Sequence, residues 1–246
     1  MERNTIDIEQ YAKHIFFYVD EVPELLLKYL YKTGWELICD LGCGDGTLLL
    51  ALKRAGYLEG KTVYAVDLSG SRVDLVSKLD PDFTCIAGDV CDLPGLEDGT
   101  FDFVVSTYVI EHVFDDEKMI REISRLVRPG GTVYLSTVFK NGLSLSLYRC
   151  NGRRTMDRTH LREYTDDSQL TEMIEECGFS ILENRRSPVR YPIIDFFVRR
   201  LSSNRNIYNC RLLRRLRILR IRMFGYYHWE LVLRSIEKAP VEETSR

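Results

Sequence analysis

The sequence has no long hydrophobic run and no export signal. None of its segments approaches the roughly 18 consecutive apolar residues that mark a membrane-spanning helix. The N-terminal stretch MERNTIDIEQYAKH carries charge from its second residue and lacks the apolar segment of a secretion signal. We therefore expect a protein of the cytoplasm that is neither exported nor threaded through a membrane.

The cysteine and histidine patterns exclude further kinds of site. The seven cysteines stand at positions 39, 43, 85, 91, 150, 177 and 210 without any Cys-x-x-Cys spacing. An odd, scattered set of this kind indicates neither a disulfide framework nor a zinc knuckle, and it fits a reducing compartment. The chain also has only four histidines, so few imidazoles are available for acid–base chemistry.

Apolar runs bounded by turn residues alternate with helix-period segments through the first 185 residues. This alternation is typical of parallel βαβ units, and 246 residues suit a single domain of that class. No internal repeat is visible. The predicted strands are 37–41, 62–68, 83–87, 101–106, 132–136, 179–184 and 227–233, and the predicted helices are 47–55, 71–78, 115–127 and 166–177.

The stretch DLGCGDG lies where the first predicted strand turns into the first helix. Gly42 and Gly44 let a ligand approach the backbone without meeting a Cβ, while Cys43 contributes its backbone alone. Pyrophosphate binders show G-x-G-x-x-G, but here the spacing is G-x-G-x-G and Asp40 stands before the loop. That carboxylate would repel a pyrophosphate, so the loop favours an ammonium or sulfonium cation.

Two more acids follow the next two strands. Asp67 ends the second strand, where an acid accepts hydrogen bonds from ribose hydroxyls, and Asp89 follows the third, in reach of an adenine amine while the amide of Val90 bonds the ring. Each acid alone is as readily explained as a turn or helix-cap residue. Their joint occurrence at successive strand ends predicts a site for a cationic adenosyl ligand.

Residues 36–137 resemble the core of the class I S-adenosylmethionine-dependent methyltransferases. DLGCGDG resembles the first motif of that family, VYAVDLS the second and AGDVCDLP the third, and FDFVVSTYVIEHV with the later RLVRPGG resembles the fourth and the segment after it. The resemblance implies S-adenosylmethionine as cofactor and S-adenosylhomocysteine as product. The cofactor-binding residues that we predict are Asp40, Gly42, Cys43, Gly44, Asp67, Leu68, Asp89, Val90, Thr107 and, in a covering N-terminal helix, Tyr11.

The resemblance also implies the fold. It is an α/β, Rossmann-like, seven-stranded, mostly parallel sheet of order 3-2-1-4-5-7-6, with strand 7 antiparallel and helices on both faces. We expect a single domain over 1–246. It comprises an N-terminal helical cap (1–35), the cofactor-binding core (36–137) and insertions on the substrate side after strands 5 and 6 (138–165 and 185–226).

His112 and His160 are the candidate catalytic residues, because both fall at the carboxyl edge of the predicted sheet. Some relatives, among them ubiquinone-biosynthesis and small-RNA O-methyltransferases, hold a divalent metal with Glu-x-x-Glu-His and a later histidine. Here Tyr108 replaces the first glutamate, while Glu111 is present. A three-ligand metal site, a metal-free pair of imidazoles and a purely structural role all stay open.

The segment 185–222 carries twelve arginines, no lysine and one acid, although the whole chain has a net charge of only −3. Leu212, Leu216, Leu219 and Met223 form a helix-like stripe among them. Three interpretations of these arginines stay open. They form a solvated face, they bind the phosphates of an anionic acceptor, or they bring 185–224 into contact with an acidic membrane. No RNA-binding module is visible, so a nucleic acid partner is not indicated.

These patterns predict a methyltransferase that acts on an oxygen of a small or glycan-like acceptor, phosphate-bearing or lipid-linked. The enzyme would be cytoplasmic, with peripheral membrane association left open. One alternative is a catalytically silent scaffold of the same fold that interacts through the arginine-rich insertion. A second, a nicotinamide dehydrogenase, is disfavoured by the glycine spacing.

Overall fold

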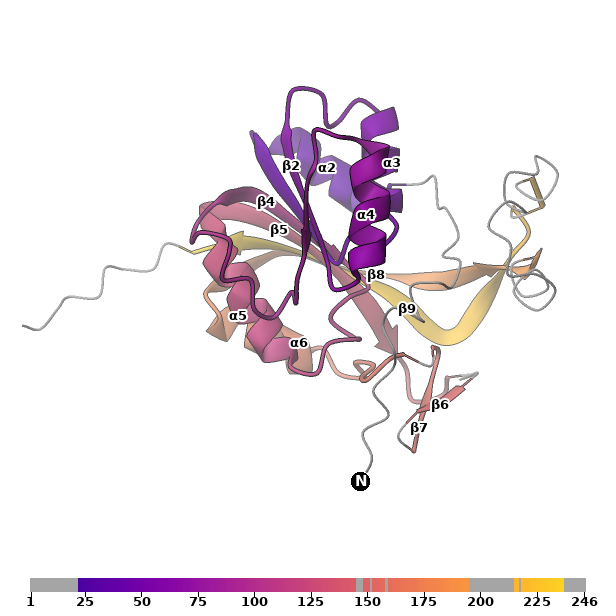
Figure 1. Ribbon diagram of the computed structural model, residues 1–246. Helices are drawn as coiled ribbons and strands as arrows, with labels where there is room; N and C mark the ends of the chain where they lie inside the picture. Colours follow the sequence, from indigo (N-terminus) through magenta and orange to yellow (C-terminus); the bar gives the residue numbers. More distant parts are fainter. Residues whose placement is uncertain are drawn as a thin grey trace, which may run out of the picture.

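The computed structural model describes residues 22–144, 148–150, 152–157, 159–194, 215–216 and 218–236. A seven-stranded sheet runs through this part of the chain in the order β3-β2-β1-β4-β5-β9-β8 (Figure 1). Its strands are β1 (Leu37–Leu41), β2 (Thr62–Asp67), β3 (Thr84–Ala87), β4 (Phe101–Thr107), β5 (Val127–Lys140), β8 (Phe179–Pro192) and β9 (Arg220–Ser235).

The strand directions confirm the predicted topology. All neighbours from β3 to β5 pair in parallel, whereas β9 is antiparallel to both β5 and β8. Strands β8 and β9 thus correspond to the predicted strands 6 and 7. A separate hairpin of β6 (Tyr148–Cys150) and β7 (Arg153–Thr155) lies in the segment after β5.

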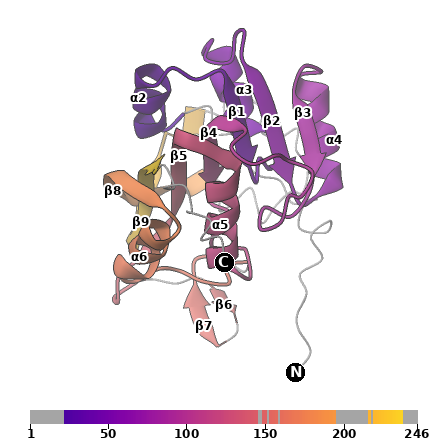
Figure 2. The same ribbon diagram turned by 90° about the vertical axis from the view of Figure 1, so that its left-hand side faces the viewer.

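Helices cover both faces of the sheet (Figures 1 and 2). On one face, apolar residues of α2 (Glu24–Lys32), α3 (Thr47–Arg54) and α4 (Gly70–Leu79) share a core with the inner strands. On the other, α5 (Asp116–Leu126) and α6 (Ser168–Glu176) pack on β4, β5 and β9. These two layers leave the carboxyl ends of β1 to β5 at one common edge, where ligands of such sheets bind.

The sequence of α5 shows why its boundaries were predictable. Asp115 caps the helix, because its Oδ1 accepts a hydrogen bond from the Lys118 amide at 2.8 Å. Met119, Ile123 and Leu126 recur at helical spacing and are fully buried against the sheet. The predicted segment 115–127 therefore contains the observed helix with one extra residue at each end.

The predicted helical stripe through Leu219 and Met223 is wrong. Met223 lies in β9, where it is buried beside Val138 and Val189, and Leu219 is not helical. Because β9 pairs with β8, successive side chains of β9 point to opposite faces of the sheet. This strand pairing determines the local structure in spite of the helical spacing of the leucines. Leu212 lies outside the described residues.

The N-terminal cap is described from residue 22 onward, so the predicted cofactor contact of Tyr11 lies outside the described residues. In the described part of the cap, α2 packs through Leu26 and Leu30. None of the helices that the structure describes has the length and apolar character needed to span a bilayer.

Candidate functional site

The glycine loop after β1 is fixed to the end of β2. The amides of Gly42 and Cys43 both donate to the carbonyl of Val66, at 2.8 and 2.9 Å. Gly42 has a φ of 81°, and a Cβ built on it would lie 2.2 Å from Cγ2 of Val109. Both the backbone conformation and the close approach of the β4 loop therefore require glycine at this position.

Asp40 supplies a buried carboxylate beneath this loop. Its side chain is 1% exposed, and Oδ1 has no hydrogen-bond partner in the protein. Burial raises the pKa of Asp40 to about 7, and the negative charge of Asp67 contributes. An orphaned buried acceptor is costly, so the position fits a ligand that brings its own cationic donor, such as the ammonium of an amino acid.

Asp67 links the glycine loop to the start of α4. Its Oδ2 accepts from the amide of Gly44 and its Oδ1 from the amide of Ser69, both at 2.9 Å. Arg72 Nη1 lies 3.8 Å from Oδ2. The adjacent Leu68 is 51% exposed. The structure thus places a hydrogen-bonded carboxylate and an exposed leucine next to one another in sequence at the end of β2, while their contacts with a nucleoside stay predictions.

The remaining predicted cofactor residues lie at the ends of neighbouring strands. Asp89, just after β3, is exposed, and its Oδ1 accepts from the Cys91 amide at 2.9 Å, while Val90 is buried. Thr107 ends β4 and is half-buried. The sheet order therefore brings the acids at the carboxyl ends of β1, β2 and β3 to one edge, although their contacts with a cofactor stay predictions.

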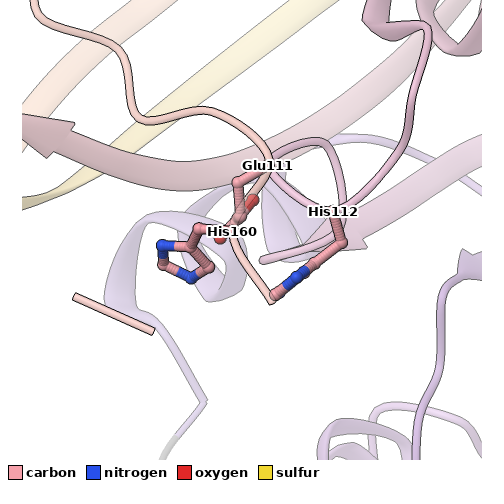
Figure 3. Close-up of side chains that lie close together, drawn as sticks. All are labelled: Glu111, His112 and His160. Carbon is pink, nitrogen blue, oxygen red and sulfur yellow. The ribbon is translucent and has the colours of Figure 1, made fainter. Parts of the chain in front are cut away.

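Glu111, His112 and His160 come together on the loops that follow β4 and β5 (Figure 3). One potential ligand atom of each side chain lies within 4.8 Å of the others, and the two imidazole rings meet edge to face with centroids 5.0 Å apart. The main chain reinforces the pairing, since the amide of Leu161 donates to the carbonyl of Glu111 at 2.8 Å.

The outer atoms of this cluster are already hydrogen-bonded. His112 Nδ1 lies 3.1 Å from the carbonyl of Thr159 and therefore carries the hydrogen, while His160 Nδ1 lies 2.9 Å from Glu163 Oε1. Glu111 Oε2 accepts from Thr137, but its Oε1 is buried without a hydrogen-bond partner in the protein. Glu111 Oε1 thus faces two imidazole rings whose orientations are fixed through their Nδ1 atoms, an arrangement typical of oriented metal ligands or bases.

The pKa values of the two histidines are shifted in opposite directions. Burial lowers the pKa of His112, and His160 adds to this effect although the charge of Glu111 opposes it. Burial also disfavours the charged form of His160, but its hydrogen bond to Glu163 and the charges of Glu111 and Asp157 outweigh burial and raise its pKa. At neutral pH His112 is consequently the uncharged imidazole, with a lone pair on Nε2.

Tyr108, the residue in place of the first glutamate, contacts a histidine outside this cluster. Its hydroxyl is hydrogen-bonded to His228 Nδ1, and its φ of 55° is strained for an aromatic residue. His228 escaped sequence reasoning because it follows 120 residues later, inside a strand. Only the pairing of β9 with β5, in which His228 stands opposite Val138, brings it to the site.

Comparisons with known proteins agree with this geometry. Residues 39–135 match a family described as "Methyltransferase domain". The chain is 36% identical over 155 residues to a ubiquinone biosynthesis O-methyltransferase of Chromobacterium violaceum, covering 58% of this chain and 64% of the relative. A protein of the same name from Ralstonia nicotianae is 32% identical over 130 residues, 49% of this chain and 52% of the relative. The chain thus spans less than two thirds of these relatives.

Solved structures share the fold at low sequence identity. A putative sarcosine dimethylglycine methyltransferase from Galdieria sulphuraria superposes with a TM-score of 0.58 at 16% identity, over 88% of this chain and 85% of the other. A geranyl diphosphate methyltransferase in complex with SAM gives 0.56 at 16% identity, over 87% and 84%. At such low sequence identity, the structural similarity establishes the fold of this chain alone.

Proposed function

We propose that this chain, in which residues 39–135 form a domain of the methyltransferase family, transfers a methyl group from S-adenosylmethionine to a hydroxyl oxygen of a small molecule. The observation that carries the proposal is the coincidence of two buried, unsatisfied carboxylate oxygens, on Asp40 and Glu111, at one sheet edge. The first suits the cationic donor and the second lies where the acceptor would lose its proton.

The protein's own groups account for binding of the donor. S-adenosylmethionine, when bound, supplies an electrophilic methyl group on a sulfonium. Asp40 would accept hydrogen bonds from its ammonium, Asp67 from the ribose hydroxyls and Asp89 from the adenine amine, with Leu68 and Val90 against the ring. Such binding aligns the methyl group with the acceptor, and alignment supplies much of the rate enhancement in a displacement with a good leaving group.

Transfer to oxygen is supported by the buried cluster beside the donor site. Breaking the sulfur–methyl bond and forming the oxygen–methyl bond leaves the acceptor proton to be removed, and uncharged His112 can take it at Nε2. The two curated relatives described above carry the name O-methyltransferase, which agrees with this choice of atom.

The same three side chains fit a divalent cation. Glu111 Oε1 and the Nε2 atoms of His112 and His160 offer a carboxylate and two imidazoles, and Glu163 orients His160 from behind. A cation held there would lower the pKa of a hydroxyl that binds to it. Chelation with EDTA followed by addition of Mg²⁺, Mn²⁺ or Zn²⁺ decides between the metal and the metal-free base.

The acceptor itself is proposed from the insertions. Segments 138–165 and 185–226 lie on the substrate side of the expected fold, and the second is rich in arginine. Guanidinium groups pair well with phosphate, so we favour an anionic acceptor, either a glycan-like molecule bearing phosphate or one linked to a lipid. A lipid-linked acceptor would entail peripheral contact with a membrane.

The test is a transfer assay with S-adenosylmethionine labelled in its methyl group and a panel of phenols, sugar phosphates and lipid-linked glycans. We expect label in an ether product. His112→Ala should lower turnover about 100-fold or more, the usual contribution of a general base, without changing cofactor affinity. A folded protein that binds no cofactor in calorimetry would support the silent scaffold instead.

A further inference from the structure

Strands β8 and β9 continue beyond the sheet as a two-stranded arm (Figure 1). The pairing of β5 with β9 ends at Lys140 and Tyr226, whereas β8 and β9 stay paired as far as Pro192 and Arg220. We define the arm by its described residues 188–194 and 218–225. Its outer part is therefore unsupported by the rest of the sheet and presents side chains to the surroundings.

Gly225 fixes the point at which the arm leaves the domain. Its φ is 77°, and a Cβ on it would lie 2.6 Å from Cα of Ser144 and 2.7 Å from the carbonyl oxygen of Leu143. The amide of Asn141 also donates to the carbonyl of Gly225 at 2.8 Å. The base of the arm is thus anchored to the loop after β5, so the arm has a defined direction.

Three arginines gather on one face of the arm. Arg190 and Arg222 are direct cross-strand partners, and Arg220 precedes Arg222 by two residues and so shares its face. All three are exposed. Among the described residues, no carboxylate forms an ion pair with Arg190 or Arg222. Like charges directly opposite one another destabilise a strand pair, so this face is suited to an anionic partner.

Large apolar side chains accompany these arginines. Ile218 is 79% exposed, Ile221 51% and Phe224 65%. Phe224 lies two residues beyond Arg222, on the arginine face of β9. A solvated basic face would carry polar neighbours, whereas cations interleaved with exposed apolar groups are typical of protein segments that lie at a membrane interface.

We propose that the arm docks on an acidic membrane surface, with Arg190, Arg220 and Arg222 on lipid phosphates and Phe224 among the acyl chains. A free phosphate would be held in a concave, desolvated site, but the arm is a projecting ribbon. The membrane is the occupant that satisfies the arginines and the apolar side chains together. The proposal uses no residue of the cofactor site, so it can be tested separately from binding of the methyl donor.

Co-sedimentation of the full chain with vesicles tests the proposal. We expect binding to vesicles of equal parts phosphatidylglycerol and phosphatidylcholine, weakened by salt, and little binding to phosphatidylcholine alone. Each arginine near an acidic surface contributes about fivefold to the partition coefficient, so Arg190→Gln with Arg222→Gln should lower it about 25-fold. Phe224→Ser should lower it about tenfold.

The matched control removes two arginines elsewhere. Arg54→Gln with Arg121→Gln changes the net charge equally, from exposed sites at the end of α3 and on α5, and should bind vesicles like the unmodified chain. Cofactor affinity should be unchanged in every variant, which separates this proposal from the proposed function.

Three outcomes would overturn the membrane proposal. The first is equal binding to both kinds of vesicle, and the second is equal binding by the arm variant and the control variant. The third is release of the protein by millimolar inorganic phosphate, which would indicate a phosphate subsite. Retention of single-stranded RNA through the same arginines, without vesicle binding, would assign the arm to nucleic acid.

Discussion

At the scale of single residues, Asp40 combines a cost to stability with a role in binding. Its carboxylate is buried, lacks a partner for Oδ1 and has a pKa raised to about 7 by burial and by Asp67. An unfolded chain would ionise this group near its ordinary value. The folded protein therefore keeps a proton that the unfolded chain has lost, and stability falls as the pH rises from about 4 to 7.

Asp40→Asn should remove this decline. We expect the free energy of unfolding at pH 7.5, measured by urea denaturation, to rise by roughly 1–4 kcal/mol, and the part of the decline between pH 4 and 7 that Asp40 causes to disappear. Asp74→Asn, at an exposed position of α4, should leave both unchanged. A less stable Asp40→Asn protein would contradict this account of the carboxylate.

The same titration predicts how cofactor affinity depends on pH. An ionised Asp40 attracts an ammonium and a protonated one does not, so affinity for S-adenosylmethionine should increase as the pH rises through about 7. Calorimetric titrations with S-adenosylmethionine at several pH values between 6 and 8 measure this affinity. The increase should be absent in Asp40→Asn, and an equal increase in that variant would assign the titration to another group.

Asp67→Ala tests the ribose contact. We expect cofactor binding to weaken by about 1–3 kcal/mol, the cost of leaving buried hydroxyls without an acceptor. Because Asp67 also accepts from the amides of Gly44 and Ser69, the variant's Tm must be measured alongside. Asp67→Asn keeps a side-chain oxygen and should lose less, whereas unchanged affinity in both variants would rule out the contact.

At the scale of helices and strands, the sequence was informative wherever structure is local. The strand 37–41 coincides with β1, and the resemblance to class I methyltransferases is confirmed by the strand order and by the family match of residues 39–135. Short-range hydrophobic periodicity and glycine turns were sufficient to predict the alternation of strands and helices, whereas the strand order was implied by the resemblance. The extensions of β8 and β9 were not predictable, because each is stabilised by a partner strand about 30 residues away.

The catalytic side of the site was only partly predictable, because some of its contacts join residues that are far apart in the sequence. Glu111 and His112 were evident as neighbours in one motif, and His160 by its place after β5. His228 and Glu163 were missed, since their roles arise from pairing across the sheet and from a hydrogen bond inside a loop. Neither contact has a fixed sequence spacing that would indicate it.

Gly225→Ala tests how the arm is joined to the sheet. It introduces both a left-handed backbone strain and a collision with Ser144 and Leu143, so we expect a loss of about 2–4 kcal/mol in urea unfolding. Gly60 has a similar φ of 69° with no atom within 4 Å of an added Cβ, and Gly60→Ala should cost only about 1 kcal/mol. Equal losses of stability in the two variants would show that Ser144 and Leu143 move to make room for the added Cβ at position 225.

At the scale of the whole molecule, a ligand that binds only the folded state raises its stability by mass action. At 100 times its Kd, S-adenosylmethionine should add about 2.7 kcal/mol, which corresponds to about 5–10 °C in Tm for a chain of this size. S-adenosylhomocysteine should act similarly. NAD should have no effect, and a larger shift with NAD would favour a dehydrogenase over a methyltransferase.

The central place of β9 between β5 and β8 also determines the order in which the sheet can be completed. Strand β8 emerges from the ribosome before β9, yet in the described part of the chain β9 is its hydrogen-bonding neighbour in the sheet. The parallel half from β3 to β5 can assemble during synthesis, while β8 waits with unpaired edges that invite association with other nascent chains. Strand β9, which follows β8 in the chain, is therefore the strand that joins β8 to the rest of the sheet.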